Sequence, residues 1–348
     1  MPDKRPLRTP DDLLAAGLIS SDRADALEAV AARYAIAITP AVASLIDAGT
    51  AGDPIGRQFV PDEAELEIAP HENADPIGDV RHSPVGGIVH RYRDRVLLKL
   101  THVCAVYCRF CFRREMVGPG EDQVLSAEGL ESAFAYIAAH REIWEVILTG
   151  GDPFILSPRR LHEVTARLAA IDHVKVLRWH TRVPIVDPER VNDELTRAIA
   201  TARQATYVAV HVNHPRELSA PARRACARLI DSGIPLLSQS VLLKGVNDDA
   251  ETLEALMRAL VETRIKPYYL HHADLAPGTG HFRTSVAEGQ TLMRGLRARA
   301  SGLCQPHYVL DIPGGHAKAQ LSPSDIEGSP GAYRLRDGEN CWHLYSRE

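Results

Sequence analysis

The sequence predicts an α/β protein built around a parallel sheet, and two observations support this fold class. Short apolar or β-branched runs recur from residue 95 onward, and longer segments with helical periodicity lie between them. Strand alternating with helix implies right-handed crossovers and therefore a parallel sheet. Six such units and a last strand fit a partial six-stranded (β/α) barrel or a doubly wound sheet, and helix periodicity alone does not choose between the two.

The predicted elements follow in order along the chain. Residues 1–50 are expected to form helices, because residues 9–12 read Thr-Pro-Asp-Asp, a typical helix start, and residues 26–34 have helical spacing. Residues 50–84 are rich in Gly, Pro and Asp, which predicts an extended linking arm. The predicted strands are residues 96–100, 145–148, 174–179, 207–212, 236–242, 266–270 and 308–310. The predicted helices are residues 127–139, 158–170, 188–202, 220–231, 250–263 and 286–300.

Composition limits the function classes. The 348 residues are 45% hydrophobic and 24% charged, which is ordinary for a globular protein with a large core. The net charge of −5 argues against a general nucleic-acid binder. No apolar run approaches the ~18 residues of a membrane-spanning helix, and residues 1–18 lack the apolar core of a signal peptide. Free thiols fit the reducing cytoplasm, so we expect a cytoplasmic protein without a membrane partner.

Three of the six cysteines lie within eight residues, directly after the first predicted strand of the sheet. Cys104, Cys108 and Cys111 have the spacing C-x3-C-x2-C. Three neighbouring thiolates suit a [4Fe–4S] cluster, in which three cysteines leave one of the four irons open for another ligand. Disulfides are disfavoured, because three close cysteines cannot all pair with one another. A structural zinc ion is the alternative, with His102 as its fourth ligand.

Polar residues follow the carboxyl ends of the predicted strands, where functional groups collect in parallel α/β folds. They are the three cysteines, residues 149–153, residues 180–182, residues 211–215, Gln239, residues 271–274 and residues 311–318. Each alone could be a helix cap or a buried polar residue, but seven in register predict one shared site. Glycine at positions 150 and 151 would let the backbone approach a ligand closely.

Basic residues accompany these strand ends in a chain that is net acidic. Arg91, Arg95, Arg113 and Arg114 form a local island, and arginine forks recognise phosphate or carboxylate. A solvated charged face is the alternative interpretation. Lys318 lies just past the last strand, where it could reach across the mouth of a barrel, although an exposed loop lysine is the commoner case.

Taken together, these motifs resemble the lysine 2,3-aminomutase family of radical S-adenosylmethionine (radical SAM) enzymes. The resemblance rests on residues 90–95, the cysteine motif with Arg109 and Arg113, residues 149–153, 213–215, 239–248 and 267–269, Asp274 and residues 311–318. It implies a partial (β/α)6 barrel of radical SAM type with an N-terminal helical extension. We accordingly divide the chain into a helical region and linking arm at residues 1–85, the barrel with its cofactor site at residues 86–320 and a tail at residues 321–348.

The resemblance also implies three cofactors and the residues that would hold them. A [4Fe–4S] cluster would be held by Cys104, Cys108 and Cys111. S-adenosylmethionine would be contacted by Gly150, Gly151, Asp152, His211 and Gln239. Pyridoxal 5'-phosphate would be attached covalently to Lys318, with Arg91 and Arg95 at its phosphate and Tyr92 near its ring.

The substrate implied by the resemblance is an amino acid with a distant cation. Arg113 would pair with the substrate carboxylate, and Asp274 and Asp311 with its side-chain ammonium. One arginine, one aldehyde cofactor and two carboxylates match the three polar groups of lysine. The implied reaction is the interconversion of L-lysine and β-lysine by 1,2-amino migration, an isomerase reaction. It would need an electron from a reductase, a flavodoxin or a ferredoxin.

Several alternatives stay open. The enzyme could act on arginine or ornithine, or could make β-lysine for attachment to elongation factor P, which the short chain favours. A non-catalytic metal-binding or interaction protein on the same barrel is the non-enzyme alternative. The larger aminomutases carry further zinc-binding cysteines, whereas this chain has only Cys341 in its tail and Asp249 at another ligand position. We therefore expect no zinc, and a homo-oligomer is left open.

Overall fold

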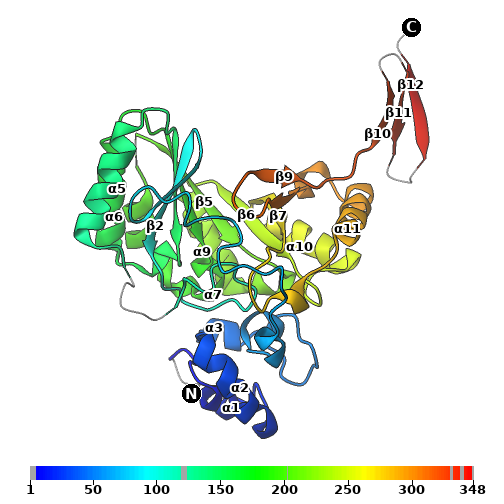
Figure 1. Cartoon of the computed structure of the whole chain (residues 1–348), viewed down its shortest axis with the longest axis horizontal. Helices are drawn as coiled ribbons and strands as arrows, with labels where there is room; N and C mark the ends of the chain where they lie inside the picture. Colours follow the sequence, from blue (N-terminus) through cyan, green and yellow to red (C-terminus); the bar gives the residue numbers. More distant parts are fainter. Residues whose placement is uncertain (1–4, 119–123, 202, 330–331, 338–340, 347–348) are drawn as a thin grey trace.

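The computed structural model describes residues 5–118, 124–201, 203–329, 332–337 and 341–346. Within these residues the chain forms a curled nine-stranded sheet with helices around it, an N-terminal helical region and a small C-terminal sheet (Figure 1). None of the described helices combines the length and the apolar character needed to span a lipid bilayer.

The large sheet has the strand order of a partial barrel. Its strands lie side by side in sequence order, and β2 through β8 are parallel, flanked by the antiparallel edge strands β1 and β9. The strands are β1 (Ile88–Tyr92), β2 (Arg95–Thr101), β3 (Glu145–Gly150), β4 (Val176–Thr181), β5 (Ala205–His211), β6 (Leu236–Leu242), β7 (Ile265–His272), β8 (His307–Asp311) and β9 (Lys318–Gln320). A doubly wound sheet would reverse its strand order midway. The observed order therefore confirms the barrel.

Among the described residues, six helices of seven or more residues connect the parallel strands, and each begins at a side-chain cap that accepts a backbone N–H hydrogen bond. They are α5 (Ala127–Ala139), α6 (Pro158–Ala169), α8 (Asp193–Ile199), α9 (Ala220–Asp231), α10 (Ala250–Glu262) and α11 (Val286–Arg299). The four-residue helix α7 (Val183–Val186), between β4 and β5, has no such cap. The prediction of one helix over residues 188–202 was wrong, because Asn192 caps a new helix after the short turn η3 (Pro188–Arg190). Asp249, noted above for its position, is the cap of α10.

Alternation along the strands separates the hydrophobic core from the interior of the barrel. On β4, Leu177 and Trp179 are fully buried in the hydrophobic core, which also includes the buried side chains of the surrounding helices. The residues between and after them, Arg178 and His180, line an internal cavity instead. Because successive strand residues point to opposite faces, polar side chains at every second position face the cavity without entering the core.

The N-terminal region packs against the barrel. Its helices α1 (Pro10–Ala15), α2 (Ser21–Arg33) and α3 (Pro40–Ala43) confirm the helical prediction. The linking arm is mostly irregular but contains α4 (Gly56–Phe59) and the turn η1 (Glu63–Leu66). Three of its polar side chains, Gln58, Glu65 and Asp79, have 0% exposure. Buried polar groups need partners, and these residues find theirs in the barrel.

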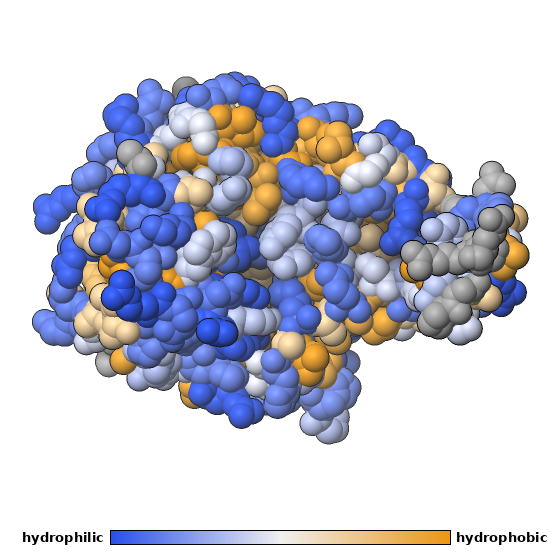
Figure 2. Space-filling model, turned by 90° about the horizontal axis from the view of Figure 1, so that it is seen from above, coloured by the Kyte–Doolittle hydropathy of each residue, from blue (hydrophilic) through white to orange (hydrophobic). Residues whose placement is uncertain are grey.

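The C-terminal tail forms a second sheet that was not predicted. Strands β10 (Ile326–Ser329), β11 (Ala332–Arg336) and β12 (Trp342–Ser346) pair antiparallel and stand apart from the barrel (Figure 1). Several of its large apolar side chains are exposed, among them Leu344 and Tyr345. On the face of the molecule shown in Figure 2, hydrophilic residues predominate and hydrophobic ones gather in separate patches.

Candidate active site

A cavity of about 510 Å³ lies inside the curl of the sheet. Its walls come from both edge strands and from the carboxyl ends of the parallel strands between them. All fifteen residues that received a cofactor or substrate role from the sequence line it: Arg91, Tyr92, Arg95, Cys104, Cys108, Cys111, Arg113, Gly150, Gly151, Asp152, His211, Gln239, Asp274, Asp311 and Lys318. Segments up to 227 positions apart in the chain therefore meet in one place, as the strand-end pattern predicted.

The three cysteines lie partly buried on the loop after β2. Burial raises the pKa of the Cys104 thiol, and the nearby Asp152 carboxylate and the two other thiols add to this effect. Burial and the neighbouring Cys108 raise the pKa of Cys111 to about 11. The described residues contain no group of three His, Cys, Asp or Glu side chains arranged as ligands of a single metal ion. Three partly buried thiols whose charges act on one another fit the separate irons of a cluster, and the positive charge of those irons would deprotonate them.

Buried ion pairs fasten this loop to the linking arm. Arg109 donates from Nε and Nη2 to the Glu65 carboxylate at 2.6 to 3.1 Å, and Arg114 pairs with the same carboxylate. Arg113 donates from Nε to Oδ2 of Asp79 at 2.8 Å. The solvated-face interpretation therefore fails for Arg113 and Arg114. Nothing local in the sequence indicates these acidic partners, because they lie 34 to 49 positions away from their arginines.

The two glycines at the end of β3 lie directly against the backbone that leads into the cysteine loop. A Cβ on Gly150 would lie 2.3 Å from the carbonyl oxygen of Thr101, and one on Gly151 would lie 2.2 Å from that of Val103. Gly150 also has a φ of +117°, which favours glycine. The close approach that the sequence predicted is thus to the backbone leading into the cysteines. Contact with S-adenosylmethionine remains a proposal.

Asp152 ties two strand ends together. Its carboxylate accepts hydrogen bonds from the backbone N–H of Phe154 at 3.0 Å, from Oγ1 of Thr181 at 2.7 Å and from the backbone N–H of Arg182 at 2.7 Å. Burial raises the pKa of Asp152, although these hydrogen bonds oppose the effect. Both carboxylate oxygens are engaged within the protein, so the side chain orders the loops beside the cysteines.

Neutral histidines line the middle of the cavity. His211 on β5 lies in register with Gln239 on β6. Burial, together with the charges of nearby cations, lowers the pKa of His211 and of His271 to about 3. Burial also lowers the pKa of His180, whose ring centroid lies 5.9 Å from that of His211. His180 and His271 received no role from the sequence, although both belong to strand-end runs noted there. Their places at inward-facing positions near the ends of strands are the sequence signal that could have identified them.

A cationic and aromatic group comes from the β1–β2 hairpin. The Arg95 guanidinium lies 3.9 Å from the Tyr92 ring centroid, and that of Arg91 lies 5.3 Å from it. Arg95 also pairs with Asp94 at 2.7 Å. The Tyr92 hydroxyl and Nε of Arg91 are buried without a hydrogen-bond partner among the described residues. Two arginines and an unpartnered hydroxyl fit a phosphate-bearing aromatic cofactor.

Lys318 lies on β9, opposite Asp311 on β8, and the two side chains form an ion pair. Nη2 of Arg91 on β1 lies 3.3 Å from the same carboxylate, so these charges bridge the open side of the barrel. The Lys318 side chain is only 21% exposed, which rejects the exposed-loop interpretation. Burial lowers the pKa of Lys318, although Asp311 opposes the effect. A lowered pKa favours the neutral amine that can attack a carbonyl group.

Asp274 and Asp311, the two cavity carboxylates assigned to the substrate, have pKa values shifted in opposite directions. Burial opposes ionisation of Asp311, but the adjacent cations Lys318 and Arg91 help to hold the pKa of Asp311 below its ordinary value. Burial and the Asp311 charge raise the pKa of Asp274 to about 7. Asp274 is therefore poised to gain or lose a proton near neutral pH.

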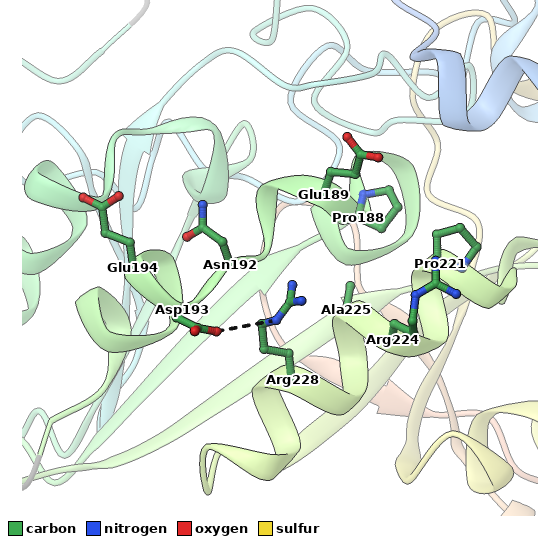
Figure 3. Close-up of a pocket in the computed structure, with 9 residues that line it drawn as sticks. All are labelled: Pro188, Glu189, Asn192, Asp193, Glu194, Pro221, Arg224, Ala225 and Arg228. Carbon is green, nitrogen blue, oxygen red and sulfur yellow. Dashed lines mark ion pairs between the residues drawn. The ribbon is translucent and has the colours of Figure 1, made fainter.

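A second hollow of about 570 Å³ lies outside the barrel, between η3, α8 and α9 (Figure 3). Its lining is mostly exposed and charged, and it includes an ion pair between Asp193 and Arg228 at 3.6 Å. None of the residues assigned from the sequence lines it. Despite its slightly larger volume, this hollow offers no convergent reactive groups, so the chemistry belongs to the internal cavity.

Part of the barrel matches a known protein superfamily. Residues 98–257, which include the three cysteines and the two glycines, match the radical SAM superfamily. A solved radical SAM methyltransferase from Sphaerobacter thermophilus is 22% identical, with a TM-score of 0.46 over 64% of this chain and 68% of that chain. The superfamily match, together with the cysteine loop, indicates a radical SAM enzyme.

Relatives with higher sequence identity show which family within this superfamily the chain belongs to. The L-lysine 2,3-aminomutase of Acetoanaerobium sticklandii is 41% identical over 84% of this chain and 70% of its own length. That of Clostridium subterminale is 39% identical over 89% of this chain and 74% of its own length. The glutamate 2,3-aminomutase of Clostridioides difficile is 36% identical over 85% of this chain and 70% of its own length. This chain belongs to the lysine 2,3-aminomutase family, whose members are isomerases that use a [4Fe–4S] cluster, S-adenosylmethionine and pyridoxal 5'-phosphate.

Proposed function

We propose that the protein interconverts L-lysine and β-lysine by moving the α-amino group to the neighbouring carbon. The observation that carries the proposal is one cavity lined by three thiols, one lysine amine and five carboxylates, Asp274 and Asp311 among them. Relatives named L-lysine 2,3-aminomutase support the same reaction. The arginine, ornithine and non-enzyme alternatives have no comparable support.

The residues would divide the work as follows. Cys104, Cys108 and Cys111 hold the cluster, and residues at the ends of β3, β5 and β6 surround S-adenosylmethionine. The β1–β2 hairpin and Lys318 hold pyridoxal phosphate. When bound, these groups supply hydrogen-atom abstraction and a carbonyl carbon that carries the migrating nitrogen. The chain itself binds and orients the amino acid and keeps water away from it.

Substrate choice rests on charge in the cavity. The family includes enzymes named for lysine and for glutamate, which differ in the sign of the side-chain charge. Asp274 and Asp311 would attract an ammonium and repel a carboxylate, so the same pair selects for lysine and against glutamate. Arg113 would bind the carboxylate that all amino acids share.

An anaerobic assay tests the proposal. The full chain, reconstituted with iron, sulfide and pyridoxal phosphate, is given S-adenosylmethionine, a chemical reductant and one of four amino acids: lysine, arginine, ornithine or glutamate. Chromatography then measures each β-amino acid. We expect β-lysine as the main product. Turnover of glutamate alone would contradict the role of the acidic pair, and turnover of arginine or ornithine above lysine would replace the proposed substrate.

Asp274 gives a pH-dependent prediction. An acid with a pKa of about 7 loses its charge as the pH falls through 7, and only its ionised form attracts an ammonium. The KM for lysine should therefore rise as the pH falls from 8 to 6. Replacing Asp274→Asn should raise KM at pH 8 by about 10- to 100-fold, the effect of losing a charged hydrogen-bond partner.

The same variant should also flatten the pH profile of KM below pH 7. Asp172→Asn, at an exposed aspartate outside the cavity, is the matched control and should keep both KM and its pH profile. A KM in Asp274→Asn that still rises as the pH falls below 7 would assign the titration to another group.

We further propose that the enzyme works in the cytoplasm with a ferredoxin, a flavodoxin or a reductase as its electron donor. Residues 1–85 would act as a support for the barrel at residues 86–320, with residues 321–348 as an appended sheet. A homo-oligomer is compatible with the exposed apolar side chains of that sheet.

A further inference from the structure

The guanidinium of Arg182, just past β4, reaches one of the three cluster cysteines. Its Nη1 donates to Sγ of Cys108 at 2.8 Å. The Arg182 side chain is only 7% exposed and lies against the rings of Phe59 and Phe110, at 4.6 and 5.5 Å from their centroids. The contact is therefore made away from bulk water, where a charge acts more strongly on its neighbour.

Two acceptors hold the guanidinium in this place. Nη2 of Arg182 donates to Oε2 of Glu217 and to Oε1 of Gln58, both at 2.6 Å. The other oxygen of Glu217 accepts the backbone N–H of Asn213 at 2.9 Å and Nε2 of Gln58 at 3.1 Å. Arg182 cannot turn away from Cys108 without leaving a buried carboxylate unpaired, which is costly.

We propose that Arg182 is a positioning residue that raises the reduction potential of the cluster through its hydrogen bond to Cys108. The inference rests on the assignment of the three cysteines to a [4Fe–4S] cluster in the proposed function. Reduction by one electron adds a negative charge to the cluster and its thiolates. A cationic N–H donor beside a ligand sulfur stabilises this more negative state, because hydrogen bonds to the sulfurs and local charge set cluster potentials.

The test is a redox titration of the reconstituted full chain, followed by the electron paramagnetic resonance signal of the reduced cluster. Arg182→Gln removes the charge and should shift the midpoint potential of the cluster to a more negative value by at least about 59 mV. For one electron, this shift equals a tenfold change in the equilibrium constant for reduction. Arg182→Lys keeps the charge but loses the fork, so its shift should be smaller and of the same sign. Glu217→Gln removes the opposing anion and should leave the midpoint unchanged or move it to more positive potential.

The two midpoint shifts distinguish an effect of charge from an effect on folding. If Arg182 had a merely structural role, the Arg182→Gln and Glu217→Gln variants would behave alike. Arg190→Gln is the matched control: Arg190 donates to the backbone oxygen of Phe154 at 2.7 Å nearby. Its midpoint should equal that of the unsubstituted protein. Samples are compared at equal iron and sulfide content.

A wild-type midpoint in Arg182→Gln, or a negative shift in Glu217→Gln, overturns the proposal. If Arg182→Gln holds no cluster, the Arg182→Lys and Glu217→Gln titrations decide by the same signs. The measurement needs no amino acid, so a failed lysine assay leaves it standing, whereas zinc without iron at the cysteines would refute the cluster assignment on which it rests.

Discussion

Replacing Lys318→Ala is expected to abolish covalent attachment of pyridoxal phosphate and to lower the aminomutase rate by about 10³-fold or more, the scale of losing a group that bonds to the reacting molecule. Lys318 is the one lysine that lines the cavity among the described residues. Burial lowers its pKa and so favours the neutral, nucleophilic amine. Borohydride reduction followed by peptide mass analysis would locate the cofactor.

Two variants isolate the amine from the charge. Lys318→Arg keeps a cation for Asp311 but offers no nucleophile, so it should also lose the reducible link while keeping the ion pair. Lys266→Ala is the matched control, because Nζ of Lys266 donates to the backbone oxygens of Leu303 and Gln305 outside the cavity. If Lys318→Ala still carried a borohydride-reducible cofactor, another amine would be the attachment site.

Local patterns explain why so much of the site could be predicted. The cysteine spacing is a property of eight consecutive residues, and each strand-end run directly follows the strand that positions it. Because parallel strands bring their carboxyl ends to one edge, Asp311 and Cys104 can be placed together without knowing any contact between them. The alternation of side chains along a strand then decides that His180 faces the cavity and Trp179 the core.

Long-range pairing explains what could not be predicted. Glu65 and Asp79 stand in an irregular segment whose composition is typical of a solvated loop, yet both are fully buried. Their arginine partners belong to the cysteine loop, and no periodicity links the two segments. The glycine pair is a related case: Gly150 and Gly151 were expected to approach a ligand, and the atoms that would collide with their Cβ belong to β2 and to the residue just before Cys104.

Replacing Glu65→Gln is expected to lower the free energy of unfolding by about 3–5 kcal/mol, because it leaves the buried cations of Arg109 and Arg114 without their anion. Glutamine keeps the shape of glutamate and can still accept the hydrogen bond from the backbone N–H of Asp62, so the variant isolates the charge. Urea denaturation of the apoprotein under anaerobic conditions measures the change, and iron content after reconstitution reports the cysteine loop.

Glu63→Gln is the matched control for this loss, since Glu63 lies on the same turn but is exposed, and its replacement should change the free energy of unfolding by no more than about 0.5 kcal/mol. We expect Glu65→Gln to lose iron as well as stability, because Arg109 lies between Cys108 and Cys111 and its guanidinium is held by the arm. Unchanged unfolding and full iron content in this variant would show that the arm does not support the loop. A loss of both stability and iron would show that the linking arm supports the cysteine loop that generates the radical. No residue of the N-terminal helices touches a cofactor in the proposed assignment.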